Sequence, residues 1–299
     1  MKLTISKCPY FLKLFYVTSN LRLHQLMTGP LAQIISLTTY GNDFIKNGRV
    51  PIDFNTVNTT FQFCNKVDFR EFKKPFFFSK LKEKVVAQSP TEWFDYLKLD
   101  DCKHLRLYFE SSKDQSFAKD HKLAGVVGGG GRWLIEANYD GYSNYWANRW
   151  KVTNQDAADN KIWGVNYAMT VVKQHISNLQ IDNNVIKDKL RHTLTEIAEF
   201  AFKQNLQDWG EQFDQARLIL DSSSPEDNYY HKDLIPPHNY SLIAKQILFS
   251  AGTSWVFGGM GSWNDLGFDR KEDNENYERL SEQLYSTIHE AVISATNTF

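Results

Sequence analysis

Histidine and carboxylate side chains occur together at two places in the sequence, and these are the first places to consider for acid–base or metal chemistry. His231, Asp233 and His238 share a proline-rich stretch, and His192 and Glu196 lie four residues apart on one face of an expected helix. Neither group is a complete set of metal ligands, and the helical pair has the spacing of an ordinary exposed side-chain pair. The sequence therefore predicts no metal ion and no cofactor.

Two glycine-rich runs would let backbone N–H groups approach an anion such as a phosphate. The first run, residues 128–131, lacks a following Gly-Lys-Ser/Thr, and residues 132–135 continue as a strand where a phosphate loop would open a helix. The second run, residues 258–261, follows an expected helix and has the pattern of a helix C-terminal stop. Tight turns are therefore favoured over a nucleotide site.

Motifs of the common hydrolases do not occur in the chain, which contains no His-Glu-x-x-His, Gly-x-Ser-x-Gly or paired Cys-x-x-Cys. Carboxylates are nevertheless plentiful, among them Glu136, Asp140, Asp265 and Asp269. Active sites are often assembled from residues far apart in the chain. A hydrolase or a nucleotide-dependent enzyme that uses the glycine-rich segments therefore stays an alternative.

The composition is that of a folded globular protein, with 42% apolar, 14% aromatic and 23% charged residues. It excludes global disorder, collagen-like repeats and a small disulfide scaffold. Cys8, Cys64 and Cys102 are an odd number of widely spaced cysteines, which suits a reducing cytosol. No segment contains the roughly 18 uncharged apolar residues that span a bilayer, and lysines interrupt the N-terminal apolar stretch. We therefore expect a cytoplasmic protein that does not contact a membrane.

Charge is unevenly distributed, although the net charge of the whole chain is −1. Residues 1–127 hold 19 Lys and Arg against 12 Asp and Glu, a balance of +7, whereas residues 128–299 hold 15 against 23, a balance of −8. Such a chain can place the basic surface of one copy against the acidic surface of another, which would allow a homo-oligomer. From the charges alone, the favoured interpretation is a monomer with two solvated faces.

A nucleic-acid-binding module is a further alternative, because residues 70–84 mix lysines with aromatic side chains. The competing interpretation is a strand or loop edge with solvated lysines and a buried phenylalanine cluster. That interpretation is favoured, so direct binding of nucleic acid is not expected.

The elements of the first part of the chain are expected to be mainly strands. Residues 3–78 are rich in β-branched and aromatic residues between turn signals, which favours short strands. A helix begins at Ser89-Pro90-Thr91-Glu92, which supplies a cap, a first-turn proline and a capping-box glutamate. Strands are then expected at residues 104–109, 146–152 and 161–172, and residues 122–127 and 132–138 are expected to form a hairpin around the glycine run.

After residue 182 the apolar residues recur with helical spacing. Helices are expected over residues 186–202, 213–220, 240–256 and 277–292, the first behind Asp182 or Asn183 as its cap. Strands followed by helices indicate an α+β fold, with an antiparallel sheet in the N-terminal and central parts and a helical C-terminal part. The expected division is a basic, strand-rich region, 1–127, and a region that completes the sheet and adds the helices, 128–299.

Two segments together resemble the phage-encoded Gabija anti-defence proteins, which have a similar length. Residues 128–136 read Gly-Gly-Gly-Gly-Arg-Trp-Leu-Ile-Glu, and residues 255–265 read Trp-Val-Phe-Gly-Gly-Met-Gly-Ser-Trp-Asn-Asp. The similarity extends mainly over residues 125–299. It implies a non-enzymatic inhibitor that oligomerises around the bacterial Gabija nuclease-helicase complex and keeps this complex from DNA. No contact residue of the family transfers to a numbered position here.

Large aromatic residues in and near these segments are candidates for a recognition surface, because Trp and Tyr give much contact area at low entropy cost. Core packing is the competing explanation for the same residues. The expected partner is a bacterial multi-subunit defence complex, together with further copies of the chain. The candidate interaction surface consists of Arg132, Trp133, Trp255, Met260, Trp263, Asn264 and Asp265.

Overall fold

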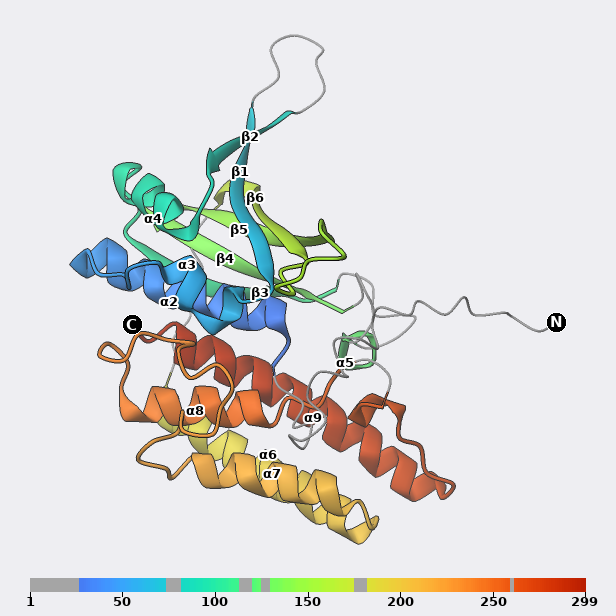
Figure 1. The fold of residues 1–299 in the computed structure, drawn as a ribbon. Helices are drawn as coiled ribbons and strands as arrows, with labels where there is room; N and C mark the ends of the chain where they lie inside the picture. Colours follow the sequence, from blue (N-terminus) through green and yellow to red (C-terminus); the bar gives the residue numbers. More distant parts are fainter. Residues whose placement is uncertain (1–26, 74–81, 113–119, 125–129, 175–181, 259–260) are drawn as a thin grey trace, which may run out of the picture.

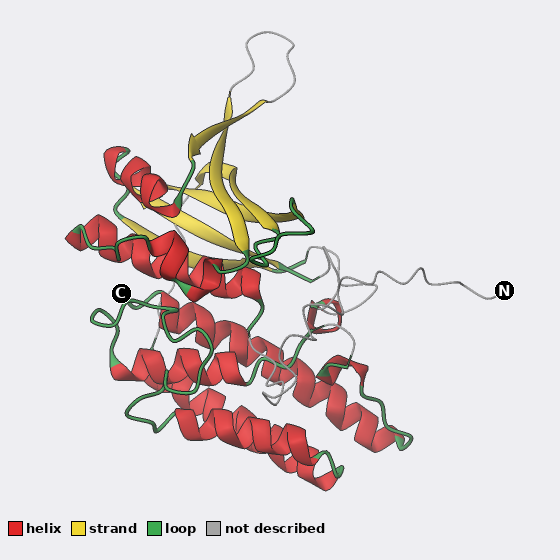
Figure 2. Cartoon of the chain, in the orientation of Figure 1, coloured by secondary structure: helices red, strands yellow, loops and turns green. Residues whose placement is uncertain are grey.

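A computed structural model of the chain describes residues 27–73, 82–112, 120–124, 130–174, 182–258 and 261–299. They form an α+β fold in which a six-stranded sheet packs against helices on one side, with a group of helices, α6 to α9, beyond them (Figures 1 and 2). The predicted fold class is thus confirmed. Among the described helices, none is both long and apolar enough to span a membrane.

The sheet is mixed rather than purely antiparallel, and its strand order is β2-β1-β6-β5-β4-β3. β1 runs parallel to β6, whereas every other neighbouring pair is antiparallel. A parallel neighbour requires a long crossover, and here the intervening chain forms β2, α4 and β3 to β5. The strands are β1 (Cys64–Lys73), β2 (Lys82–Ala87), β3 (His104–Glu110), β4 (Arg132–Tyr139), β5 (Tyr142–Val152) and β6 (Trp163–Gln174).

The hairpin expected around the glycine run is wrong. β4 pairs with β3 and β5, and residues 120–123 form the short helix α5 (Asp120–Leu123) instead of a strand. Residues 125–129 lie outside the described residues. The tight turn follows β4 instead, where Asp140 and Gly141 connect it to β5 and Gly141 has a φ of +83°. Asp-Gly is a favoured pair for a two-residue hairpin turn, because glycine adopts positive φ without strain.

Helix α2 (Gly29–Asn47) lies in a region for which the sequence predicts short strands, so the prediction is wrong there. The helix ends at Gly48, which has the left-handed φ of +67° that stops many helices. Residues 31–43 are all buried, so protein surrounds this helix. Packing therefore overrides the low helix propensity of β-branched residues such as Ile34. α3 (Phe54–Val57) and η1 (Thr59–Phe61) follow before β1 begins, and residues 3–26 lie outside the described part.

The remaining helices confirm the predictions. In α4 (Pro90–Leu99) the Glu92 N–H donates to the Ser89 side chain, and Glu92 accepts from the backbone of Gln88. α6 begins behind the predicted Asp182 cap, and α7 begins at Gln207, earlier than the predicted residue 213. The helices of the C-terminal part are α6 (Asn183–Lys203), α7 (Gln207–Ile219), α8 (Leu242–Thr253) and α9 (Lys271–Thr296), with the 3-10 turn η2 (Trp263–Asp265) before α9.

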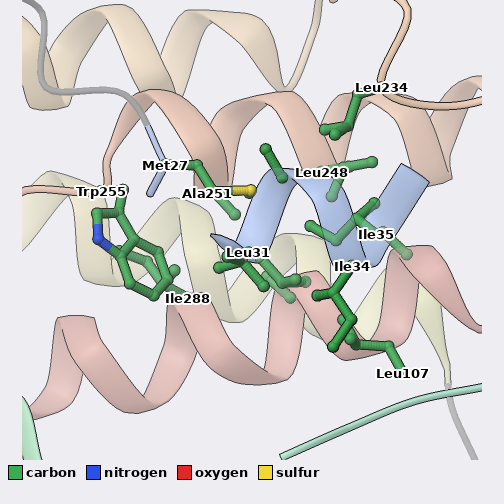
Figure 3. Close-up of a cluster of buried hydrophobic side chains, with 14 of the residues drawn as sticks. Met27, Leu31, Ile34, Ile35, Leu107, Leu234, Leu248, Ala251, Trp255 and Ile288 are labelled. Carbon is green, nitrogen blue, oxygen red and sulfur yellow. The ribbon is translucent and has the colours of Figure 1, made fainter. Parts of the chain in front are cut away.

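One continuous hydrophobic core joins the sheet to the helices. Its centre is α2, which lies between the sheet and α9 in Figure 1. Figure 3 shows Leu31, Ile34 and Ile35 of α2 among side chains from the strands and from the C-terminal helices. Those neighbours include Leu107, Leu248 and Ile288, all at most 2% exposed. Residues from both halves of the sequence thus fill a single core.

Two asparagine side chains cover the outer edge of β3, the last strand of the sheet. The Asn42 side chain donates to Leu105 O at 2.9 Å and accepts from Leu105 N–H at 2.6 Å. Asn297, just after α9, makes the same pair of bonds with Leu107, at 2.9 and 2.7 Å. An amide side chain carries one donor group and one acceptor, so it can replace the backbone of a missing neighbouring strand.

Replacing Asn42 with alanine is expected to destabilise the protein by about 2 to 4 kcal/mol, because it leaves a buried N–H and a buried C=O of Leu105 without partners. Urea unfolding followed by circular dichroism measures this change in the free energy of unfolding. The exposed Asn55 supplies the control, since Asn55→Ala removes an amide from the surface. Equal midpoints for both variants would contradict this account of the β3 edge.

Candidate interaction surface

Among the described residues, the helices that pack on the sheet cover one of its faces. α2 lies against β3 and β4, and α4 lies against β1 and β2. Leu105, Ile135 and Trp146 point toward these helices and are at most 1% exposed. Side chains alternate between the two faces along a strand. Arg106, Glu136 and Tyr145 therefore point to the other face, which we call the open sheet face.

A chain of ion pairs crosses the open sheet face from β2 to β5. Arg70 donates two hydrogen bonds to Asp68, at 2.6 and 3.0 Å, and its guanidinium lies 3.5 Å from Glu83. Arg149 reaches the same Glu83 at 2.7 Å and donates to Asn166 at 2.7 Å. β1 and β6 lie between the strands that carry Glu83 and Arg149. The two side chains meet above these strands.

Asp68 is the fixed anion of this network. It is 2% exposed, and Lys66 approaches it at 3.1 Å in addition to Arg70. Burial by itself would raise the pKa of Asp68, but the hydrogen bonds from Arg70 and Lys66 outweigh this effect and hold the pKa below its usual value. Asp68 therefore stays ionised near neutral pH and serves as a charge partner instead of a proton donor.

A second buried carboxylate, Glu136, lies on the open sheet face farther toward β3. It is 1% exposed, accepts a 2.9 Å hydrogen bond from the Tyr145 hydroxyl, and lies 4.0 Å from the guanidinium of Arg106. Burial, followed by the contact with Glu136, raises the pKa of Tyr145 far above its usual value, so this phenol stays a donor. The Glu136 carboxylate thus has a tyrosine hydroxyl on one side and an arginine on the other.

Exposed tyrosine and arginine side chains lie beside these buried carboxylates. Tyr108 is 36% exposed and packs edge-on against Tyr145, and Arg132 is exposed and paired with Glu110. Arg149 lies on the neighbouring strand β5, two residues beyond Ala147, which pairs with Leu134 of β4. Tyrosine and arginine are the residue types enriched at the centres of protein interfaces. We call the group formed by Tyr108, Glu110, Arg132 and Arg149 the sheet-face patch.

Of the residues predicted for an interaction surface, Arg132 lies in the sheet-face patch, and Asp265 is exposed elsewhere, where it accepts from the Gly261 N–H at 2.5 Å. Asn264 is half-buried and donates to His121 O at 3.0 Å. Met260 lies outside the described residues. The remaining three are the tryptophans: Trp255 and Trp263 are buried, and Trp133 is partly buried against the core.

Trp133 and Trp255 both pack on His289, with ring centroids 4.8 and 5.4 Å away. Trp263 is fully buried and donates from its indole nitrogen to Ser281 at 2.7 Å. For these three residues the structure favours the competing explanation, core packing. The geometry therefore brings Trp133 and Trp255 together around a histidine and keeps Trp263 apart from them.

His231 helps to hold two segments of the fold together, and His192 lies in an exposed pair. His231 Nδ1 lies 2.9 Å from the Thr59 hydroxyl, and Asp233 accepts from both the hydroxyl and the N–H of Thr59. This cluster attaches η1 to the loop before α8. His192 and Glu196 form an exposed i,i+4 pair at 3.4 Å, as predicted.

The glycine run before β4 has a packing reason at the two residues that are described. Gly130 has a φ of +70°, and a side chain at Gly131 would collide with the Phe109 ring and the Glu110 carbonyl. Close contact with β3 thus accounts for Gly131. Within the described ranges, no three His, Cys, Asp or Glu side chains come close enough together to hold a metal ion.

Tyr108, Arg149 and Glu83 are not among the residues predicted from the sequence. The alternation over residues 104–109 contained a signal for Tyr108, because it assigns the even-numbered residues to the face opposite Leu105 and Leu107. Nothing in the local sequence indicates that Glu83 and Arg149 meet across two strands. Comparison of the chain with protein-family models, with curated proteins and with solved structures finds no match.

Proposed function

We propose that this chain is a non-enzymatic, protein-binding inhibitor that recognises its target with the sheet-face patch. The observation that carries the proposal is a sheet face on which no described helix packs, and which displays Tyr108 and Arg132 next to a network of fixed charges. Satisfied ion pairs and a rigid strand scaffold keep these side chains in place before binding, which lowers the entropy cost of association.

The proposed target is a bacterial multi-subunit defence complex, following the resemblance to phage-encoded Gabija anti-defence proteins. Inhibition in the bacterial cytoplasm would then work by occlusion, since a bound protein of 299 residues blocks the path of DNA to the complex. Occlusion needs contact area and affinity but no bond-making step. The paired carboxylates of the open sheet face suit this role.

The cations of the open sheet face argue for a protein target rather than for nucleic acid. Arg70, Arg132 and Arg149 each have a carboxylate partner within the chain. Binding to phosphates gains affinity from cations that are free to neutralise them. Cations that are already paired are less suited to this role and better suited to a surface of mixed charge.

The double variant Tyr108→Ala/Arg132→Glu is expected to weaken binding to a purified Gabija complex by about 100-fold or more, because it removes an aromatic contact and reverses a charge within one patch. Titration calorimetry measures the affinity, and a DNA-cleavage assay measures the inhibition. Lys98→Glu is the matched control, since it reverses an exposed charge on α4, on the opposite face.

Equal affinity of the double variant and the wild type would refute the role of the sheet-face patch. Failure of the wild-type protein to elute together with the complex, or to inhibit it, would refute the proposed function. Turnover of a nucleotide or an ester by the purified chain would support the enzyme alternative instead.

A further inference from the structure

A cavity of about 540 Å³ lies beside the start of β3, at the outer edge of the sheet. Three segments that are far apart in the sequence line it: the C-terminal end of α2, residues 102–105, and the two residues Asn297 and Phe299 that follow α9. Its volume is in the range of protein cavities that hold small organic molecules, about 300 to 1,000 Å³. We call it the β3-edge cavity.

Hydrogen bonds to β3 hold the walls of the β3-edge cavity in place. Asn42 at the end of α2 is bonded to Leu105, and Asn297 is bonded to Leu107. These bonds fix both segments against the strand before any ligand is present. Asn42, Cys102 and Leu105 form the most buried part of the lining and are at most 4% exposed. A cavity that is formed in advance loses little conformational entropy when it binds a ligand.

The lining of the β3-edge cavity combines apolar and basic side chains. Ile45, Leu105 and Phe299 are its apolar residues besides Cys102. Lys46 and Lys103 are its lysines, and both are exposed. Among the described residues that line the cavity, none has an acidic side chain. A ligand of complementary chemistry therefore has an apolar body and a negatively charged group.

The two lysines differ in how many partners they have. Lys46 has no carboxylate partner within the described ranges, and its Nζ lies 5.1 Å from the centroid of the Phe299 ring. Lys103 lies 2.7 Å from Asp101 and 3.6 Å from Asp140, whose side chains are 80% and 86% exposed. Ion pairs as exposed as these are weak. Lys46 is therefore the better placed of the two to bind an anionic group.

We propose that the β3-edge cavity binds a small organic anion, whose apolar body packs on Ile45, Leu105 and Phe299 and whose carboxylate or phosphate pairs with Lys46. Charge attraction at an exposed lysine is weak in water, so burial of the apolar body supplies most of the affinity. The cavity adjoins the start of β3, whereas Glu110 of the sheet-face patch lies at its end. This inference is therefore independent of the proposed function.

The experiment uses four probes. 1-Naphthyl phosphate and 1-naphthoate have an apolar body and a negative group, 1-naphthol has the body without the charge at pH 7, and inorganic phosphate has the charge without the body. We expect each of the two organic anions to bind with a Kd below about 1 mM, and the other two probes to bind at least about tenfold more weakly. The comparison of the two anions identifies the preferred charged group.

Two-dimensional NMR of the amide groups measures the affinity and locates the site. The signals expected to shift are the backbone N–H of Leu105 and the side-chain amides of Asn42 and Asn297. Thermal unfolding gives a second measurement, because a ligand that binds only the folded protein raises its Tm. The expected rise is about 2 to 4 °C at a ligand concentration tenfold above the Kd.

Lys46→Met removes the charge and keeps most of the side-chain length. It is expected to weaken binding of 1-naphthyl phosphate about tenfold and to leave binding of 1-naphthol unchanged. Lys98→Met is the matched control, since Lys98 is a lysine on α4 whose Nζ lies 5.3 Å from the Phe44 ring and which does not line the cavity. It is expected to bind all probes as the wild type does. Thermal unfolding without probe shows whether both variants are folded.

Failure of both organic anions to bind at about 10 mM, or shifts that avoid the three lining segments, would overturn the proposal. So would equal affinity of Lys46→Met and the wild type for 1-naphthyl phosphate. Tighter binding of 1-naphthol than of either anion would also overturn it, because the cavity would then select an uncharged apolar ligand. Elution with the defence complex tests the proposed function separately, and none of these outcomes changes that result.

Discussion

Trp93→Ala is expected to lower the free energy of unfolding by about 3 to 5 kcal/mol, the usual cost of removing a buried tryptophan. Trp93, on α4, is fully buried and lies where α4 meets the sheet. Its ring stacks on Phe69 of β1 at 4.4 Å and meets Trp146 of β5 edge-on at 5.4 Å. The substitution would open a cavity between three elements that do not follow one another in the chain.

Urea unfolding monitored by circular dichroism measures this effect, and Trp93→Phe serves as the matched variant. Phenylalanine keeps an aromatic ring against Phe69. It also removes the indole N–H, which is buried without a hydrogen-bond acceptor among the described residues. We therefore expect Trp93→Phe to cost far less than Trp93→Ala. Similar losses for the two variants would show that the stacked ring is not what holds α4 to the sheet.

Acid is expected to unfold the protein through two buried histidines. Burial lowers the pKa of His231 and of His289 to about 4 in each case, and the carboxylates of Asp233 and Asp120, respectively, only partly oppose this. An unfolded histidine has a pKa of about 6.5. Neither histidine therefore lowers the free energy of unfolding above pH 6.5. Between pH 6.5 and pH 4 the free energy of unfolding falls as the pH drops, because each histidine binds a proton in the unfolded chain but not yet in the folded protein. The loss is roughly 2 kcal/mol per histidine at pH 5.

His289→Phe is expected to remove about half of this acid-dependent loss. Phenylalanine keeps the ring that stacks on Trp133, while the side-chain bond from His289 Nδ1 to Tyr285 O is lost. Thermal unfolding from pH 7 to pH 4.5 gives the measurement. His192→Phe removes a histidine from the surface and is the control. Parallel pH profiles for wild type and His289→Phe would contradict a buried neutral His289.

The sequence correctly predicted the helices and strands whose type is determined by residues within the same segment. The Ser89 cap of α4, the alternation in β3 and the apolar spacing of α6 and α9 all lie within one segment, and each of these predictions is confirmed. α2 was predicted wrongly because its surroundings stabilise it. Packing on all sides favours the helix, whereas its β-branched residues indicate a strand when they are considered alone.

The sequence did not predict which distant segments pair with each other in the sheet. The parallel contact of β1 with β6 joins residues about a hundred positions apart, for example Phe69 and Tyr167. Alternation states which residues share a face, but it does not state which strand lies next to which. The candidate surface shows the same limit, because Arg132 was predicted from its own segment, whereas Arg149 and Glu83 come together only through the order of the strands in the sheet.

The amide bonds of Asn297 to β3 have a consequence for how the chain is made. During synthesis, β3 emerges from the ribosome about 190 residues before Asn297, so one of its edges is incomplete until Asn297 has been made. In that interval the unpaired backbone can add a strand from another nascent chain. Folding in the cell should therefore depend on chaperones that shield this strand, and variants truncated before Asn297 should aggregate instead of accumulating as soluble protein.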